Sequence, residues 1–181
     1  MQLYALPQHT LVCGHRQLDL GSPQVMGILN VTPDSFSDGG RYTSIDAALA
    51  QATQMTREGA VILDIGGEST RPDADPVSEQ QELDRVLPVV EALAQRLDVM
   101  LSIDTSSPSV FRAAAAMTPC IWNDVRALTR PNALQTAAEL QLPVILMHMR
   151  GEPATMNQLA HYEDVLTEVM AELALRRDAA L

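Results

Sequence analysis

Aromatic and basic side chains are both scarce in this sequence. Phe, Trp and Tyr make up 3% of the 181 residues, so a core has to be built from aliphatic side chains and Met. Lys and Arg total 12 against 23 Asp and Glu, a formal net charge of −11. This acidic balance argues against a general nucleic-acid-binding surface. No run of about 18 uncharged apolar residues occurs, so we expect no membrane partner.

Cysteine is also rare. Cys13 and Cys120 show no metal-type spacing, so we expect two reduced thiols. The N-terminus lacks the basic and apolar regions of a secretory signal, which leads us to expect a cytoplasmic protein. Hydrophobic residues reach 46% of the chain and the mean hydropathy is +0.01. These values exclude a disordered chain and predict a single domain over residues 1–181.

A two-part pattern repeats along the chain: a short apolar run, then a loop and an amphipathic stretch rich in Ala and Leu. The apolar runs cover residues 25–29, 61–65, 99–103, 120–122 and 143–147. Their continuous hydrophobicity and β-branched content are typical of buried parallel strands. The stretches between them are predicted to be helices, and two of these are expected over 132–140 and 162–178.

Capping signals mark the expected ends of the other helices: Ser44 with Gly59, Ser78 with Gln81, and Ser107 with Pro108. The charged residues Glu79, Glu82, Asp84 and Arg85 are expected to form a solvated helix face.

Alternating strands and helices predict an α/β fold with a parallel sheet. Most of the apolar runs end in a polar side chain, namely Asn30, Asp64, Asp104, Asn123 and His148. Such groups at the carboxyl ends of strands are typical of the rim of a (β/α)₈ TIM barrel. A dinucleotide-binding G-x-G-x-x-G turn does not follow the first run. Residues 1–22 contain a turn at Gly14-His15, which predicts a β-hairpin that caps the N-terminal end of the barrel.

Two loops could bind a ligand. The loop over residues 30–40 is longer than the usual βα connection of about 2–6 residues, which predicts a lid or binding loop, with an inert insertion as the alternative. Residues 66–72 contain two glycines, two hydroxyls and Arg71. Backbone amides and a guanidinium can hold an anion, although an ordinary turn with an exposed arginine has the same composition.

Asp104 and Asn123 end two successive apolar runs. A carboxylate and a carboxamide held on rigid strands suit a flat heterocycle with alternating donors and acceptors. The alternative for Asp104 is a helix N-cap. Strand alternation predicts that Asn123 points into the barrel mouth and Trp122 points outward. His148 is either a structural histidine or a functional one, and no second ligand lies at a zinc-like spacing.

Several segments together resemble bacterial dihydropteroate synthases. Residues 26–40, MGILNVTPDSFSDGG, resemble the first signature of that family, and residues 64–72, DIGGESTRP, resemble the second. The segments SIDT at 102–105, NDV at 123–125 and LMHM at 146–149 follow in the family's order. The resemblance extends from Leu18 to the end of the chain.

The resemblance implies a TIM barrel and a reaction. Members condense p-aminobenzoate with 6-hydroxymethyl-7,8-dihydropterin diphosphate, which yields dihydropteroate and pyrophosphate for folate synthesis. Sulfonamides inhibit them as p-aminobenzoate mimics, Mg²⁺ accompanies the diphosphate, and the full-length form is expected to be a homodimer. The main alternative within barrels of this kind is a pterin-dependent methyltransferase.

The resemblance also implies roles for individual residues. For the pterin they are Asp104, Asn123, Val125 and Met147. For the diphosphate they are Thr70 and Arg71, with Asn30 beside Mg²⁺. For p-aminobenzoate they are Phe36 and Pro72. Asp34 and Asp104 are the expected catalytic carboxylates.

The family pattern continues beyond the segments found here, with an Asp-Pro-Gly-Phe-Gly segment, a Ser-Arg-Lys-Ser segment and an Arg-x-His segment. We therefore expect a barrel truncated after about five βα units, an N-terminal portion of a longer protein that is inactive alone. The other hypothesis is a non-catalytic fragment that acts as a binding module.

Overall fold

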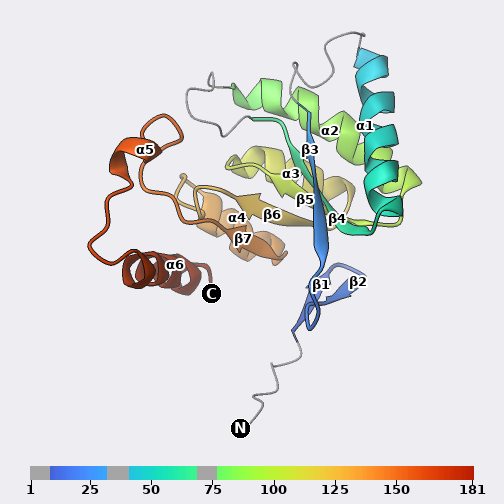
Figure 1. Cartoon of the computed structure of the whole chain (residues 1–181). Helices are drawn as coiled ribbons and strands as arrows, with labels where there is room; N and C mark the ends of the chain where they lie inside the picture. The colour runs from blue at the N-terminus through green and yellow to red at the C-terminus, as the bar shows by residue number, and fades with distance from the viewer. Residues whose placement is uncertain (1–8, 32–40, 69–76) are drawn as a thin grey trace, which may run out of the picture.

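A parallel sheet of five strands, ordered β3-β4-β5-β6-β7, forms the centre of the molecule, and a two-stranded hairpin that is not hydrogen-bonded into this sheet precedes it (Figure 1). The computed structural model describes residues 9–31, 41–68 and 77–181. The strands are β1 (Thr10–Cys13), β2 (Arg16–Asp19), β3 (Val25–Asn30), β4 (Ala60–Gly66), β5 (Met100–Asp104), β6 (Cys120–Asp124) and β7 (Val144–Leu146). The helices are α1 (Arg41–Arg57), α2 (Glu79–Arg96), α3 (Pro108–Met117), α4 (Ala133–Leu140), α5 (Met156–Leu159) and α6 (Val165–Ala180).

The five predicted apolar runs all form strands of the parallel sheet. Neighbouring strands pair in sequence order, for example Asp64 with Ser102 and Asp104 with Asn123. Consecutive parallel strands need a crossover between them, and each crossover in this sheet contains a helix. The architecture therefore corresponds to the first five βα units of the predicted barrel.

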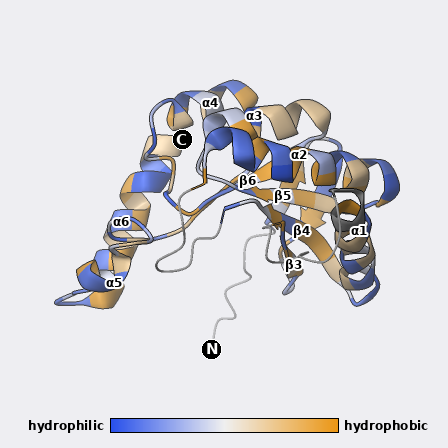
Figure 2. Cartoon of the chain, turned by 90° about the horizontal axis from the view of Figure 1, so that it is seen from above, coloured by the Kyte–Doolittle hydropathy of each residue, from blue (hydrophilic) through white to orange (hydrophobic). Residues whose placement is uncertain are grey.

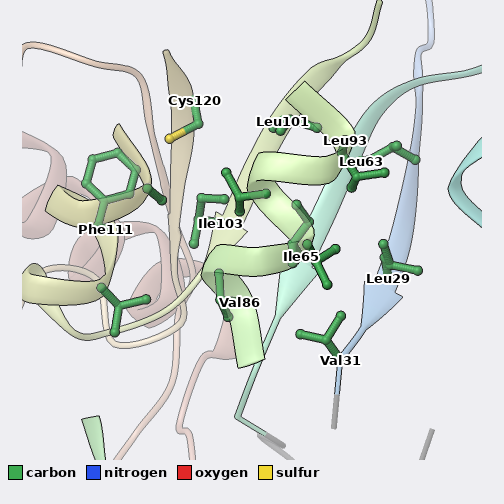
Figure 3. Packing of buried hydrophobic residues seen from close by; sticks show 14 of the residues in the cluster. Leu29, Val31, Leu63, Ile65, Val86, Leu93, Leu101, Ile103, Phe111 and Cys120 are labelled. Carbon is green, nitrogen blue, oxygen red and sulfur yellow. The ribbon is translucent and has the colours of Figure 1, made fainter. Parts of the chain in front are cut away.

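Helices α1 to α4 cover one face of the curved sheet and leave the other face, called the inner face below, without helices (Figure 2). The main core lies between these helices and the sheet. In Figure 3, Val86 and Leu93 of α2 lie over the strand residues Leu63, Ile65 and Ile103. Burial of aliphatic side chains stabilises this layer by about 1.5–3 kcal/mol for each side chain fully removed from water.

The core also contains Trp122, which points outward as strand alternation predicts. Its ring stacks on Phe111 of α3 with centroids 4.5 Å apart, and its indole Nε1 donates a hydrogen bond of 2.7 Å to the carbonyl of Thr105. Asn123, the next residue, therefore lies on the inner face, as predicted.

The N-terminal hairpin caps the barrel as predicted. Its turn contains Gly14 at φ +59°, a left-handed conformation that glycine adopts without strain. Cys13 of β1 packs with Ile62, Met100 and Ile121, which lie near the N-terminal ends of β4, β5 and β6. The hairpin thus covers the inner face at the end opposite the polar strand termini.

Two of the three capping predictions are confirmed. Ser78 and Gln81 form a reciprocal capping box on α2, and Ser107 accepts a hydrogen bond from the Val110 amide at the start of α3. The prediction for Ser44 is wrong, because α1 already begins at Arg41.

Two other differences are small. Helix α6 begins at Val165 and not at residue 162, because Asp164 is its cap. The single turn of α5 was not predicted.

In the described part of the chain, no helix combines the length and the apolar composition needed to cross a membrane.

Candidate active site

Polar side chains gather on the inner face, near the carboxyl ends of β3 to β6. Asn30 pairs in register with Gly66, Gly66 with Asp104, and Asp104 with Asn123. These pairings place Asn30, Asp104 and Asn123 along one rim, on β3, β5 and β6, with Gly66 of β4 between the first two. The strand register thus brings three of the predicted site residues to the same edge of the sheet.

Gly66 lies between two of these side chains. A Cβ atom at this position would lie 3.3 Å from Oδ2 of Asp104 and 3.7 Å from Oδ1 of Asn30. Its φ is not in the left-handed region, so glycine is favoured here for space. The missing side chain keeps this part of the rim open.

Asp104 is not used as a helix cap. Ser107 caps α3, which removes the alternative explanation for a carboxylate at this strand end. Burial, and after it the neighbouring carboxylates of Asp64 and Glu82, raise the pKa of Asp104 from its ordinary value of 3.8 to about 7. A carboxylate in this situation favours a ligand that brings positive charge or N–H donors.

Asp64 lies beneath this rim. The carboxyl group is 4% exposed, and its Oδ2 accepts a hydrogen bond of 3.1 Å from Nδ2 of Asn123. Burial raises the pKa of Asp64, while the Ser102 hydroxyl and the Asn123 amide oppose that rise. The sequence placed Asp64 at a strand end, but no role was predicted for it.

Val125 and Met147 line one cavity of about 480 Å³, together with residues of α6 such as Arg176. Asp104 and Asn123 are not among its lining residues. The structure therefore brings together the two predicted apolar pterin contacts, and separately the two polar ones, but it does not place all four in one cavity.

Arg126 connects three loops at the rim. Its guanidinium Nε donates a hydrogen bond of 2.6 Å to Glu152, and Nη1 lies 3.4 Å from Glu68 and 3.0 Å from the Ser106 hydroxyl. The side chain is 6% exposed. Glu68 follows β4, Ser106 follows β5 and Glu152 follows β7, so one side chain fixes three loops relative to the strand that carries Asn123.

The neighbouring Asp124 holds its own turn. Its Oδ1 accepts hydrogen bonds from the Ser106 hydroxyl at 2.5 Å and from the Arg126 amide at 2.9 Å, and Oδ2 accepts one from the Leu128 amide. These buried contacts favour an orienting role for Asp124 and Arg126 over a catalytic one.

Glu82 corrects one sequence expectation. The sequence predicts a place on a solvated helix face for this residue, but Glu82 is 5% exposed, and burial raises its pKa. The cause is the close approach of α2 to the loop after β4. A Cβ atom at Gly67 would lie 2.8 Å from Val86 and 3.2 Å from Glu82, so the glycine lets the helix come near.

His148 has a structural environment. Its Nε2 lies 2.7 Å from the Glu172 carboxylate of α6, and its ring packs at a tilt against Tyr162. These contacts favour the structural interpretation over the functional one.

Five predicted site residues lie outside the described residues: Asp34, Phe36, Thr70, Arg71 and Pro72. For the described ranges, no group of three or more His, Cys, Asp or Glu is arranged to hold a metal ion. Mg²⁺ is often held by only one or two protein oxygens besides phosphate and water. Asn30 at the end of β3, with its amide oxygen near Gly66, fits such a minimal ligand set.

Comparison with known proteins identifies relatives of this chain. Residues 26–181 match the sequence profile of a family described as pterin binding enzyme. Dihydropteroate synthase of Haemophilus influenzae is 54% identical over 171 residues, which is 94% of this chain and 62% of that protein. The chain thus spans less than two thirds of that relative's length.

Solved structures of dihydropteroate synthases are also similar to this chain. The Yersinia pestis dihydropteroate synthase in complex with a sulfonamide drug has a TM-score of 0.88 and 51% identity, over 95% of this chain and 62% of that one. The Xanthomonas albilineans enzyme with 4-aminobenzoic acid has a TM-score of 0.85 and 49% identity, over 94% and 60%.

Proposed function

Because this chain belongs to the family of pterin binding enzymes, we propose that it forms the pterin-binding part of a dihydropteroate synthase. The reaction joins p-aminobenzoate to 6-hydroxymethyl-7,8-dihydropterin diphosphate and releases pyrophosphate. The observation that carries the proposal is the pair of Asp104 and Asn123 on adjacent strands at one rim, with Asp104 free of any capping role. The 4-aminobenzoic acid held by the Xanthomonas relative supports the second substrate.

The chemistry requires little from the protein besides binding and electrostatics. The C–O bond from the exocyclic methylene to the diphosphate breaks, and the amine nitrogen of p-aminobenzoate forms the new bond to that carbon and then loses a proton. Positive charge develops on the pterin as the bond breaks. The carboxylate of Asp104 stabilises that charge in a site that excludes water, and Asp34 is proposed to assist it near the reacting carbon.

The leaving group carries the opposite charge. Thr70 and Arg71 are proposed to bind the diphosphate, and Phe36 and Pro72 to shape the p-aminobenzoate pocket. Asn30 would contribute an amide oxygen to Mg²⁺, which when bound neutralises the diphosphate. The aromatic amine is already nucleophilic, so no Ser–His–Asp arrangement is needed.

Two further expectations stay predictions: that the full-length form is a homodimer, and that the protein is cytoplasmic.

Calorimetry tests the proposal. We expect the chain to bind 6-hydroxymethyl-7,8-dihydropterin diphosphate in the presence of Mg²⁺, and Asp104→Ala to weaken binding at least tenfold, since a charge-assisted hydrogen bond contributes about 1.5–3 kcal/mol. Asp46→Ala is the control, because Asp46 is exposed on α1. Unchanged affinity in Asp104→Ala would contradict the assignment.

A turnover assay then tests the expectation that the chain is inactive alone. The chain is mixed with Mg²⁺, the pterin diphosphate and p-aminobenzoate, and dihydropteroate and pyrophosphate are measured. Turnover at an ordinary enzyme rate would show that five βα units suffice. Binding without turnover would favour the view that further strands complete the site.

A further inference from the structure

Asp64 is a buried acid in a place where an apolar side chain would be the stable choice. It lies on the inner face of β4, next to Ser102 of β5 in register. One position lower on that face are Ile62 and Met100, which pack against the hairpin. Burial of a carboxylate costs free energy unless its partners compensate, so packing alone does not explain an aspartate here.

The carboxyl group is only half satisfied. Oδ2 accepts the hydrogen bond from Asn123. Within the described ranges, Oδ1 of Asp64 and the hydroxyl of Ser102 are buried without a partner at hydrogen-bond distance, although the hydroxyl is close enough to oppose the rise in the pKa of Asp64. Such an arrangement is unfavourable for stability. Residues of this kind are found where the arrangement serves a ligand.

The single hydrogen bond determines how Asn123 is oriented. A carboxylate oxygen accepts and does not donate, so it can face only the NH₂ side of the carboxamide. Asn123 therefore keeps one N–H and its carbonyl oxygen for other partners, in one fixed order. Without Asp64 the carboxamide could turn by 180° and exchange its donor and acceptor.

We propose that Asp64 is a positioning residue, which holds the carboxamide of Asn123 in one orientation so that the site selects a heterocycle with a matching donor and acceptor order. This inference rests on the proposed pterin function and goes further, because it names what determines ring specificity. The selected ring presents an acceptor nitrogen beside an exocyclic amino group, as a pterin does. A lumazine, which has a carbonyl in place of that amino group and an N–H beside it, presents the reverse order.

The matched variants are Asp64→Asn and Glu82→Gln. Asparagine has the shape of aspartate but can meet Asn123 with either its oxygen or its nitrogen, so it no longer enforces one orientation. Glu82 is the control, since it is also a buried carboxyl with an unpartnered oxygen, but it packs between α2 and the loop after β4. Urea unfolding of each variant verifies that it is folded.

Binding of 6-hydroxymethyl-7,8-dihydropterin and of the corresponding lumazine is measured by calorimetry. We expect the preference for the pterin to fall about tenfold in Asp64→Asn, with the urea midpoint unchanged or higher, and to stay unchanged in Glu82→Gln. In an Asn123→Ala background, Asp64→Asn should have no further effect. An unaltered preference in Asp64→Asn, or an equal loss in both backgrounds, would overturn the proposal.

A second measurement is independent of ligand binding. The side-chain NH₂ protons of Asn123 are observed by NMR in the 19.7 kDa chain, and we expect them to shift strongly in Asp64→Asn and not in Glu82→Gln. If the wild-type chain binds neither ring, the proposed function fails while this signal still decides the positioning role. An Asn123 signal that does not respond to Asp64→Asn would refute that role.

Discussion

The raised pKa of Asp104 leads to a prediction about stability. We consider the substitution Asp104→Asn, which keeps the shape of the side chain and removes its charge. In the unfolded chain this carboxyl group has an ordinary pKa of 3.8, and in the folded protein its pKa is about 7. Below pH 3.8 the group is protonated in both states, so its charge has no effect on stability there.

Between these two values the unfolded state ionises first. The folded protein therefore loses stability as the pH rises from about 4 to about 7, and the loss is complete above the folded pKa. A rise of about 3 pH units corresponds to about 4 kcal/mol. Because the side chain is only partly buried, solvent screening reduces this figure, and we expect about 2 kcal/mol.

The assay compares urea unfolding of the wild type and Asp104→Asn from pH 4 to pH 8.5. We expect equal stability at pH 4 and a variant that is more stable by about 2 kcal/mol at pH 8, which raises its urea midpoint by about 1 M. Asp46→Asn, an exposed substitution on α1, should not reproduce this change. A stability difference between wild type and Asp104→Asn that stays constant over the whole pH range would refute the electrostatic reasoning.

Three other substitutions test the packing of the rim and one helix. Arg126→Met removes the buried guanidinium that pairs with Glu68 and Glu152 and should lower the free energy of unfolding by about 3 kcal/mol; a loss below 1 kcal/mol in urea would contradict this. Gly66→Ala introduces a Cβ atom 3.3 Å from Asp104 and should weaken pterin binding several-fold in calorimetry while the fold persists by circular dichroism; wild-type affinity would show that the rim has spare room. Ser78→Ala removes the capping box of α2 and should cost about 1 kcal/mol in thermal unfolding, and no change in midpoint would count against the cap.

Most of the fold could be predicted because its strands are continuous apolar runs. A residue such as Ile65 or Ile103 has to be buried whatever follows it, so the run predicts a strand covered by helices. The prediction of a cap is confirmed where the serine has a matching partner, as Ser78 has in Gln81. Ser44 lacks that partner, and a serine inside a helix costs only about half a kcal/mol, so its presence does not prevent α1 from beginning at Arg41.

The errors arise where two segments approach closely in space. A charged residue in an amphipathic pattern is ordinarily exposed, and the pattern around Glu82 does not show that Gly67 of a distant loop brings α2 near. The same limit applies to Asp64. Its position at a strand end was visible, but the hydrogen bond to Asn123 joins residues 59 positions apart and depends on the order of strands in the sheet.

These buried acids give the rim a common electrostatic character. The carboxylates of Asp64, Glu82, Glu68 and Asp124 all raise the pKa of Asp104, and the chain has no lysine, since all 12 of its basic residues are arginines. A neutral ring gains little from such a site, whereas a ring that becomes positive as its diphosphate leaves gains more at the transition state than in the ground state. Interactions that strengthen in the transition state are those that accelerate a reaction. The instability that these carboxylates impose on the folded chain is therefore consistent with a site arranged around a developing cation.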